Sequence, residues 1–249
     1  MKLLIDLGNT RLKAALPGAG GLQLLGEAAH REQGLEAALS QALQGVDLGL
    51  VGAALCANVA GEAAGGVVSS WLQARGCGPV AFLRACREAY GVRCAYPDPS
   101  HLGADRWAAL LGARGLTDEP CLIIDAGSAL TVDALAPGGR HLGGWIIPGL
   151  AMMVAALSER TGELAKLRQA SKRAVPGGFP TDTGPAMDDG ARIAATGAVL
   201  LARRRLEAHC AAPARLLLAG GDARDLQEAW PEAEYVPDLV LRGLARAAG

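Results

Sequence analysis

Lysine is scarce in this sequence, and no block of it concentrates Lys and Arg. These two residue types number 24 against 25 Asp and Glu, which leaves a formal net charge of -1 at pH 7. A chain without a basic stripe lacks the surface needed to bind along a phosphate backbone, so we expect no nucleic acid among its partners. Aromatic residues make up only 4% of a chain that is 51% hydrophobic, so small aliphatic side chains must build the core.

Metal-binding cysteine patterns and membrane spans are also missing. The six cysteines show no C-x-x-C spacing, and no histidine pair lies near them, which excludes the common zinc sites. The longest uncharged stretch, 141–158, is interrupted by glycine and proline, and Asp6 lies inside the first apolar run. We therefore expect a cytoplasmic protein with scattered reduced thiols, no signal peptide and no membrane partner.

Two widespread nucleotide-binding motifs are absent as well. No lysine follows a glycine, so the pattern G-x-x-x-x-G-K-[ST] cannot occur, and no strand contains G-x-G-x-x-G. Any nucleotide site in this chain must be of another type.

The sequence does contain a short internal repeat. The segment IDLGNTRLKAAL (5–16) aligns without gaps to IDAGSALTVDAL (124–135) and matches it at five of twelve positions, at an offset of 119 residues. That offset is close to half the chain, which is typical of a duplication. We expect two domains, 1–116 and 117–249, with the boundary in the Gly- and Pro-containing stretch 115–120.

Each half opens with an apolar run that ends in Asp-x-Gly and is followed by a second short strand, which predicts a β-hairpin. Helical periodicity then alternates with further strands, so the fold class is α/β. The expected strands are 3–7, 12–16, 48–55, 122–124, 131–135 and 215–219. The expected helices are 31–44, 61–75, 105–115, 149–158, 185–209 and 222–229.

The two Asp-x-Gly loops have the chemistry of a phosphate site. Glycine lets backbone N–H groups approach an anion, Asn9, Thr10 and Ser128 add side-chain donors, and Lys13 adds positive charge. Asp6 can hold a hydrated Mg²⁺ between protein and phosphate. A single such loop is more typical of an ordinary hairpin turn, but two related loops favour a nucleotide in a cleft between the halves.

Five segments carry a resemblance to a known family: DLGNTRLK (6–13), YPDPSHLGADRWAALLGA (96–113), IDAGSALTVDAL (124–135), GGWIIPGLAMMVAAL (143–157) and AGGDA (219–223). Together they resemble type III pantothenate kinase, in the expected order and over nearly the whole chain. This family belongs to the acetate and sugar kinase/actin-like ATPase superfamily, which is built from two duplicated ribonuclease-H-like domains with a nucleotide cleft between them. The resemblance implies ATP-dependent phosphorylation of pantothenate to 4′-phosphopantothenate, the first step of coenzyme A biosynthesis.

The resemblance also implies roles for the loop residues. Ser128 stands where the family usually has threonine and keeps the hydroxyl donor, while Asp125 matches the position used for a monovalent cation, K⁺ or NH₄⁺. With ATP and Mg²⁺ these are the implied cofactors. The residues implied to bind ATP in the first loop are Asp6, Leu7, Gly8, Asn9, Thr10, Arg11, Leu12 and Lys13.

The segment GADR (103–106) resembles the family's G-x-D-R motif, which implies substrate binding by Gly103, Ala104, Asp105 and Arg106. Asp105 would accept the proton of the acceptor hydroxyl, and Arg106 could clamp the carboxylate of pantothenate with paired donors. Outside this motif, the pair would be an acidic residue in a helix's first turn and a solvated arginine.

Two more substrate-binding residues are implied, each with an open alternative. Tyr96 matches a substrate-contacting tyrosine by its spacing from Asp105, although it could be a loop aromatic, and Tyr90 is a nearby competitor. Thr183 matches the family's threonine before a long helix, but Asp182 replaces the usual asparagine, so Thr183 could equally be a helix-entry residue.

The remaining expectations concern assembly and other functions. The apolar middle of helix 185–209 predicts a buried or subunit-interface helix, and the family forms homodimers. The four histidines, His30, His101, His141 and His209, are interpreted as surface or core residues. A regulatory, partner-binding protein of the same fold, or another small-molecule kinase or phosphatase, is the alternative function.

Overall fold

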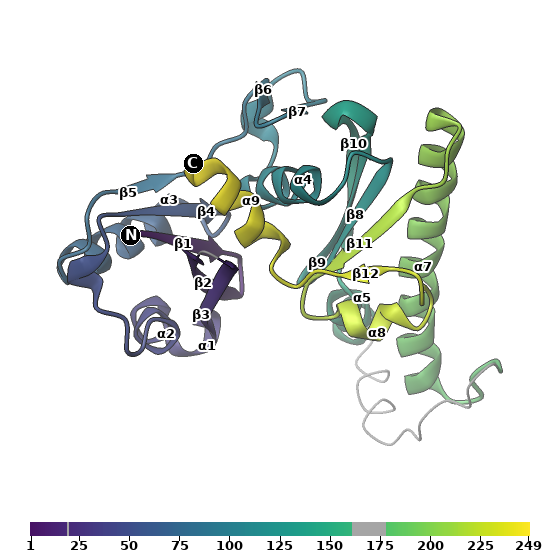
Figure 1. Ribbon diagram of the computed structural model, residues 1–249. Coiled ribbons are helices and arrows are strands. Elements are labelled where there is room, and N and C mark those ends of the chain that lie inside the picture. The colour runs from purple at the N-terminus through teal and green to yellow at the C-terminus, as the bar shows by residue number, and fades with distance from the viewer. Residues whose placement is uncertain (19, 161–177) are drawn as a thin grey trace. The chain divides into compact units, whose positions relative to one another are not determined.

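The computed structural model describes residues 1–18, 20–160 and 178–249 as two compact units that are interleaved along the chain (Figure 1). Unit 1 comprises residues 1–119, 135–143 and 238–249. Unit 2 comprises residues 120–134 and 144–237. Two later segments of the chain therefore belong with the first 119 residues, while the expected domain bounds, 1–116 and 117–249, stay a prediction.

Unit 1 contains a five-stranded mixed sheet in the order β3-β2-β1-β4-β5. Strand β1 pairs antiparallel with β2 and parallel with β4, which in turn pairs parallel with β5. The strands are β1 (Lys2–Leu7), β2 (Arg11–Gly18), β3 (Gly21–Ala29), β4 (Ala53–Asn58) and β5 (Val80–Phe82). The helices of this unit are α1 (His30–Gln33), α2 (Leu35–Ala42), α3 (Glu62–Gln73), α4 (Ala104–Leu116) and α9 (Leu239–Ala248).

The two faces of this sheet are covered by different helices. Leu3, Ile5 and Leu7 of β1 belong to a buried cluster with α2 and α3. Because side chains alternate along a strand, Leu4 and Asp6 face the opposite side, where α9 contacts β1 and both α4 and α9 contact β4. The alternation in β1 therefore directs Asp6 to the face that carries α4.

Helices α4 and α9 cross at two glycines. A Cβ on Gly243 would lie 1.8 Å from the carbonyl oxygen of Ala108, and one on Gly112 would lie 2.3 Å from that of Leu239. No side chain larger than hydrogen can occupy either position without moving a backbone. The crossing thus fixes how closely α9 approaches α4.

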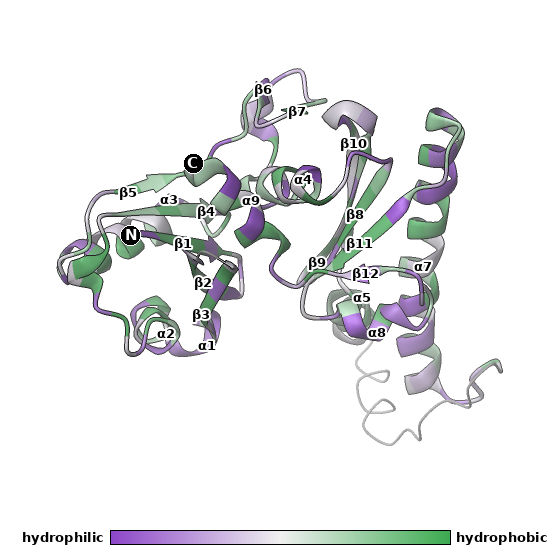
Figure 2. Ribbon diagram, in the orientation of Figure 1, coloured by the Kyte–Doolittle hydropathy of each residue, from purple (hydrophilic) through white to green (hydrophobic). Residues whose placement is uncertain are grey.

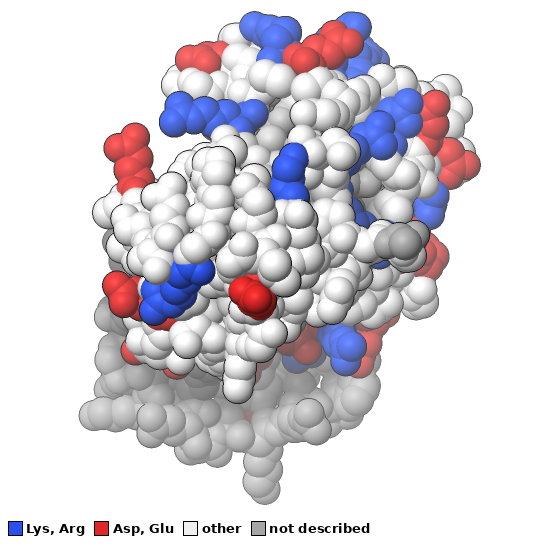
Figure 3. Space-filling model, turned by 60° about the vertical axis from the view of Figure 1, so that its left-hand side comes forward, with Lys and Arg blue, Asp and Glu red and all other residues white. Residues whose placement is uncertain are grey.

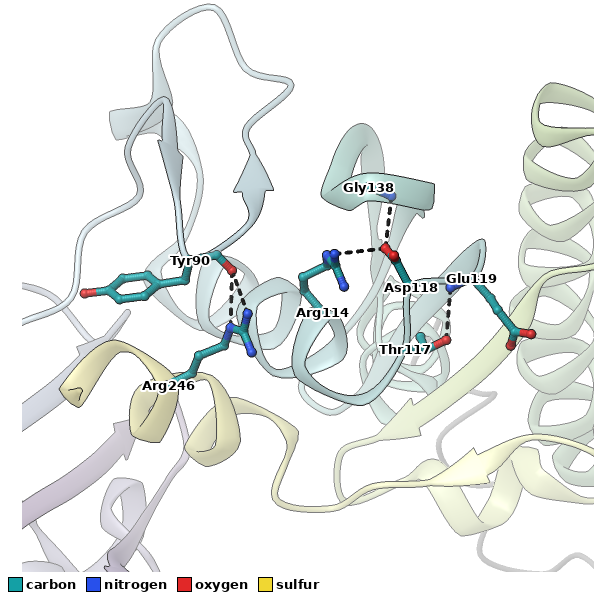
Figure 4. Close-up of polar contacts among 7 residues, drawn as sticks. All are labelled: Tyr90, Arg114, Thr117, Asp118, Glu119, Gly138 and Arg246. Carbon is teal, nitrogen blue, oxygen red and sulfur yellow. Dashed lines mark hydrogen bonds and ion pairs between the residues drawn. The ribbon is translucent and has the colours of Figure 1, made fainter.

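The ends of these helices are held by polar contacts (Figure 4). The guanidinium of Arg246 donates from Nε and Nη2 to the carbonyl of Tyr90, at 3.2 and 3.1 Å. At the end of α4, Arg114 forms an ion pair of 2.9 Å with Asp118, whose carboxylate also accepts from the N–H of Gly138 at 3.1 Å. These contacts tie 135–143 and 238–249, distant in sequence, to the first part of unit 1.

A second sheet has seven strands in the order β12-β11-β8-β9-β10-β7-β6. Strands β8 and β11 are buried and are drawn mostly green in Figure 2, as expected for strands covered on both faces. The strands are β6 (Glu88–Ala89), β7 (Val92–Arg93), β8 (Cys121–Ala126), β9 (Ala129–Ala136), β10 (Arg140–Pro148), β11 (Arg215–Ala219) and β12 (Glu234–Tyr235). The helices of unit 2 are α5 (Leu150–Arg160), the long α7 (Thr183–Cys210) and α8 (Ala223–Gln227).

The two sheets repeat one arrangement. Read from β5, the first sheet runs β5-β4-β1-β2-β3, and the first five strands of the second run β12-β11-β8-β9-β10. In each, the strand that ends in Asp-x-Gly is central, with its sequence neighbour on one side and a parallel strand on the other. The predicted α/β class with two similar mixed sheets is confirmed.

Some predicted elements differ from the structure. The helix expected over 31–44 is interrupted at Gly34, whose φ of 85° ends α1 and precedes α2. The strand expected over 48–55 was wrong in its first part, because Leu48–Leu50 forms a 3-10 turn. The side chain of Asp47 accepts from the N–H of Gly49 and stabilises this turn in competition with a strand.

Candidate active site

The first Asp-x-Gly loop is a tight turn between β1 and β2. Leu7 pairs with Leu12, and the N–H of Gly8 donates to the carbonyl of Arg11 at 3.0 Å. Asp6 and Lys13 are directly opposite each other in the register, so their side chains lie on the same face of the sheet. The predicted carboxylate and the predicted cation of this loop are therefore neighbours.

The G-x-D-R motif begins at the same edge of the sheet. The N–H of Val59, just after β4, donates to the carbonyl of Leu7 at 3.0 Å. A Cβ on Gly103 would lie 3.8 Å from Cγ1 of the same Val59, so the start of α4 adjoins the carboxyl ends of β1 and β4. Unit 1 thus brings the first loop and Asp105 to one edge, which is where open α/β sheets bind ligands.

Asp105 lies in the first turn of α4 and is partly buried. Its Oδ1 accepts from the N–H of Arg106 at 2.7 Å. A Cβ on Gly103 would lie only 2.6 Å from that oxygen, so any larger residue would displace the carboxylate. The glycine of the motif is needed for the position of its aspartate.

Arg106 is not the solvated arginine of the alternative interpretation, because it is only 5% exposed. Its Nη1 donates to the hydroxyl of Tyr96 at 3.0 Å. The Tyr96 ring stacks on His141, with centroids 6.1 Å apart and planes 15° apart. Tyr90, the competing tyrosine, instead donates from its hydroxyl to the carbonyl of Ala247 at 3.1 Å.

The segment that carries Tyr96 is held from two sides. Arg87 donates to the carbonyls of Tyr96 and Pro97, at 3.1 and 2.6 Å. The N–H of Ala95 donates to Nδ1 of His141 at 3.4 Å. These contacts hold the hydroxyl of Tyr96 in front of a buried guanidinium, a pair that can bind a carboxylate.

The second Asp-x-Gly loop, in unit 2, is surrounded by glycines. The N–H of Gly149, just before α5, donates to the carbonyl of Ser128 at 3.1 Å. Gly220 follows β11 with a φ of 95°, and a Cβ there would lie 2.5 Å from Oδ1 of Asp125. The turn continues to Asp222, whose N–H donates to the carbonyl of Ala126 at 2.9 Å. Asp125 and Ser128 thus lie at the carboxyl edge of β8 and β11, beside the AGGDA segment.

Thr183 is the first residue of α7 and follows the N-cap residue Asp182. One helical turn later, Met187 packs with Val154 of α5 in a small buried cluster. Thr183 is therefore a helix-entry residue, and its role in substrate binding stays a prediction.

A family model of type III pantothenate kinases matches residues 2–204. The chain belongs to the type III pantothenate kinase family. A relative in this family from Nitrosococcus oceani is 35% identical, with 100% of this chain and 94% of the relative covered. Another relative, from Aromatoleum aromaticum, is 39% identical, with 100% of this chain and 98% of the relative covered.

Solved structures agree with the family's fold. A protein from Campylobacter jejuni, named for the Baf family of transcriptional activators, has a TM-score of 0.61 at 25% identity, with 98% of this chain and 96% of that protein covered. One from Sinorhizobium meliloti, named for 2-dehydro-3-deoxygalactonokinase, has a TM-score of 0.63 at 15% identity, with 100% and 98% covered. The second likeness shows a shared fold alone.

The cation chemistry of a pantothenate kinase suits these loops. In the part of the chain that the structure describes, no three His, Cys, Asp or Glu side chains form a metal cluster. Mg²⁺ keeps much of its water and needs one or two carboxylates plus phosphate oxygens, so a single carboxylate such as Asp6 is sufficient. All six cysteines are free, and burial raises the pKa of Cys121 to about 12, so this thiol does not supply a thiolate ligand.

Three residues that contact the candidate site were not predicted from the sequence. His30, Arg87 and His141 each bond to a segment that carries predicted site residues. They come from α1, the stretch before β6 and β10, and no local motif marks them. A side chain that contacts such a segment through a backbone N–H or carbonyl leaves no pattern in a single sequence.

Two further observations concern partners. Within the described residues, no helix is both long enough and apolar enough to span a bilayer. On the face drawn in Figure 3, acidic and basic side chains are interspersed among uncharged ones.

Proposed function

We propose that this protein transfers the γ-phosphoryl group of ATP to the C4′ hydroxyl of pantothenate, giving 4′-phosphopantothenate for coenzyme A synthesis. The observation that carries the proposal is the meeting, at one edge of unit 1, of the first Asp-x-Gly loop with the start of α4. Phosphoryl transfer requires a phosphate-binding loop beside a carboxylate that can accept the proton of the attacking hydroxyl. Both features occur here in a chain of the pantothenate kinase family.

Different residues are assigned to the two substrates, ATP and pantothenate. Loop amides, Asn9, Thr10 and Lys13 bind phosphate oxygens of ATP, and Ser128 adds a hydroxyl donor from the second loop. Asp105 accepts the proton of the pantothenate hydroxyl. The remaining residues assigned to pantothenate are Tyr96, Gly103, Ala104, Arg106 and Thr183.

Two cations complete the proposal. Asp6 holds Mg²⁺ through water, and Asp125 holds a monovalent cation, K⁺ or NH₄⁺. When bound, they offset negative charge on the phosphates. The close approach of Gly220 to Oδ1 of Asp125 leaves room beside this carboxylate that a larger side chain would fill.

The proposal includes a cytoplasmic homodimer that binds neither nucleic acid nor membrane. The homodimer is supported by an exposed apolar face of α7, on which Ile193, Leu200 and Leu201 are 63%, 42% and 46% exposed. Large apolar side chains grouped on one helix are typical of a subunit interface.

The decisive experiment measures ADP release with ATP, Mg²⁺ and K⁺, with and without pantothenate. We expect pantothenate-dependent release, and we expect Asp105→Asn to lower kcat about 10²- to 10⁴-fold while both ligands still bind. The matched control is Asp98→Asn, which changes an exposed carboxylate of the same segment and should leave kcat near the wild-type value.

Near-normal turnover by Asp105→Asn would end the assignment of the base. If ATP binds but pantothenate changes nothing, the substrate assignment is wrong, and a regulatory protein or another kinase replaces it. The regulatory alternative is not favoured, because the family model and the relatives at 35% and 39% identity are pantothenate kinases.

A further inference from the structure

We propose that His30 is a positioning residue for the first phosphate loop: it holds the carbonyl of Gly8 so that the N–H of Asn9 is directed towards a phosphate oxygen of ATP. The inference rests on the proposed function of this loop, and it adds a residue that lies outside the loop and outside every family motif of the sequence.

His30 contacts the loop twice. Its Nε2 lies 2.8 Å from the carbonyl oxygen of Gly8, and its backbone N–H donates to the carbonyl of Thr10 at 3.0 Å. It stands at the start of α1, directly after β3, and β3 pairs with β2 up to the match of Ala29 with Arg11. The sheet therefore fixes the backbone of His30, and the side chain transmits that position to the loop.

The direction of the Asn9 N–H follows from the geometry of the peptide bond. The Gly8–Asn9 bond is trans, so the carbonyl of Gly8 and the N–H of Asn9 point in opposite directions. Holding the carbonyl on His30 therefore aims the N–H of Asn9 away from His30. Asn9 itself is exposed at the tip of the turn, where a bound anion could accept this hydrogen bond.

The hydrogen bond from His30 adds a second restraint to Gly8, whose N–H already donates to the carbonyl of Arg11. Gly8 has wide backbone freedom, and a loop whose peptide plane can rotate loses entropy when it orders around phosphate. A loop already held in the binding conformation avoids that loss, so removing the restraint should weaken ATP binding.

The chemistry of the contact defines the substitutions that test it. Because a carbonyl oxygen only accepts, Nε2 of His30 must carry the hydrogen. Glutamine places an amide N–H at a similar reach, whereas asparagine is one bond shorter and leucine has no donor. His30→Gln should therefore keep the contact, and His30→Asn and His30→Leu should lose it.

The experiment combines steady-state kinetics with calorimetric binding of ADP and Mg²⁺ in the absence of pantothenate. We expect His30→Leu and His30→Asn to raise the KM for ATP and the Kd for ADP about three- to tenfold, the range of one lost hydrogen bond. The KM for pantothenate should stay unchanged, and His30→Gln should restore nucleotide affinity. The control is Gln33→Leu, which breaks an exposed contact of α1 with Gln41 that does not touch the loop.

Each outcome decides the inference. Unchanged nucleotide affinity in His30→Leu, or equal affinities in His30→Gln and His30→Asn, would show that the side chain has only a structural role. If His30→Leu does not fold, the comparison of glutamine with asparagine still decides. Absence of pantothenate turnover in the wild type would end the proposed function, while the ADP binding arm would still test His30.

Discussion

Gly103 shows how a residue without a side chain determines where a charged one lies. A Cβ on Gly103 would lie 2.6 Å from Oδ1 of Asp105, so the carboxylate can keep its position only because glycine has no side chain. The motif was recognisable in the sequence, and so were the loop residues Asp6 to Lys13. The sequence did not indicate the contacts that hold these segments, because His30 and Arg87 bind backbone carbonyls and His141 stacks on a ring, and no local motif marks such contacts.

The hydrogen bond between Tyr96 and Arg106 gives a prediction about pantothenate binding. Tyr96→Phe removes the acceptor 3.0 Å from the guanidinium of Arg106, a residue that is 5% exposed, so the cation proposed to bind pantothenate loses part of its orientation. We expect the KM for pantothenate to rise about tenfold and kcat to change much less, since a hydrogen bond to a charged group contributes about 1.5–3 kcal/mol. Steady-state kinetics at saturating ATP measure both constants.

Tyr90→Phe is the matched control. It removes a hydroxyl that bonds to Ala247 in the last turn of α9, so it should lower the melting temperature slightly and leave the KM for pantothenate unchanged. Equal effects of the two substitutions on that KM would contradict the assignment of Tyr96.

Among the elements, those with a clear apolar period were predictable. Strand 215–219 was predicted with the bounds of β11, and helix 105–115 corresponds closely to α4. The pattern failed where a local interaction competes with it, as in the 3-10 turn after Asp47. Helix α9 was not predicted, although its buried residues, which include Val240, Leu241 and Leu244, recur at helical spacing.

The crossing of α4 and α9 gives a prediction for the elements. Gly243→Ala would place a Cβ 1.8 Å from the carbonyl oxygen of Ala108, so the helices must separate. We expect the free energy of unfolding to fall by about 1–3 kcal/mol, as for other overpacked cores. Urea denaturation followed by circular dichroism measures this change.

Gly66→Ala is the control in the same unit. Gly66 lies in α3, and a Cβ there would meet nothing within 4 Å. Because alanine favours helix over glycine, this variant should gain roughly 0.5–1 kcal/mol. A loss in both variants would mean that the crossing is not the reason for the glycine at 243.

For the whole molecule, the similarity of the two sheets could be predicted because both Asp-x-Gly loops have the same local pattern. The interleaving of the units was not visible, because it depends on packing between segments that share no motif. Residues 135–143 contribute His141 to the Tyr96 segment, and residues 238–249 contribute α9 to the sheet of unit 1. Such contacts are decided by the folded core and not by local propensity.

The proposed homodimer gives a prediction about the mass of the protein in solution. Light scattering should give twice the chain mass of 25.4 kDa for the wild type. Leu200→Glu places a charge in the apolar face of α7 and should shift the mass towards the monomer, since an unpaired charge is costly to bury in an interface. Leu24→Glu changes a leucine of β3 that is 58% exposed and should leave the mass unchanged. A wild type of 25.4 kDa would end the proposal.

Because α9 belongs to unit 1, it determines when this unit can finish folding during synthesis. Unit 1 lacks one of its covering helices until residue 248 has been made, roughly 130 residues after Glu119. At about 5–20 residues per second, this interval lasts roughly 6 to 26 s. During it, the face of β1 that α9 later covers has no helix over it, so unit 1 can complete its fold only after all of unit 2 has been synthesised.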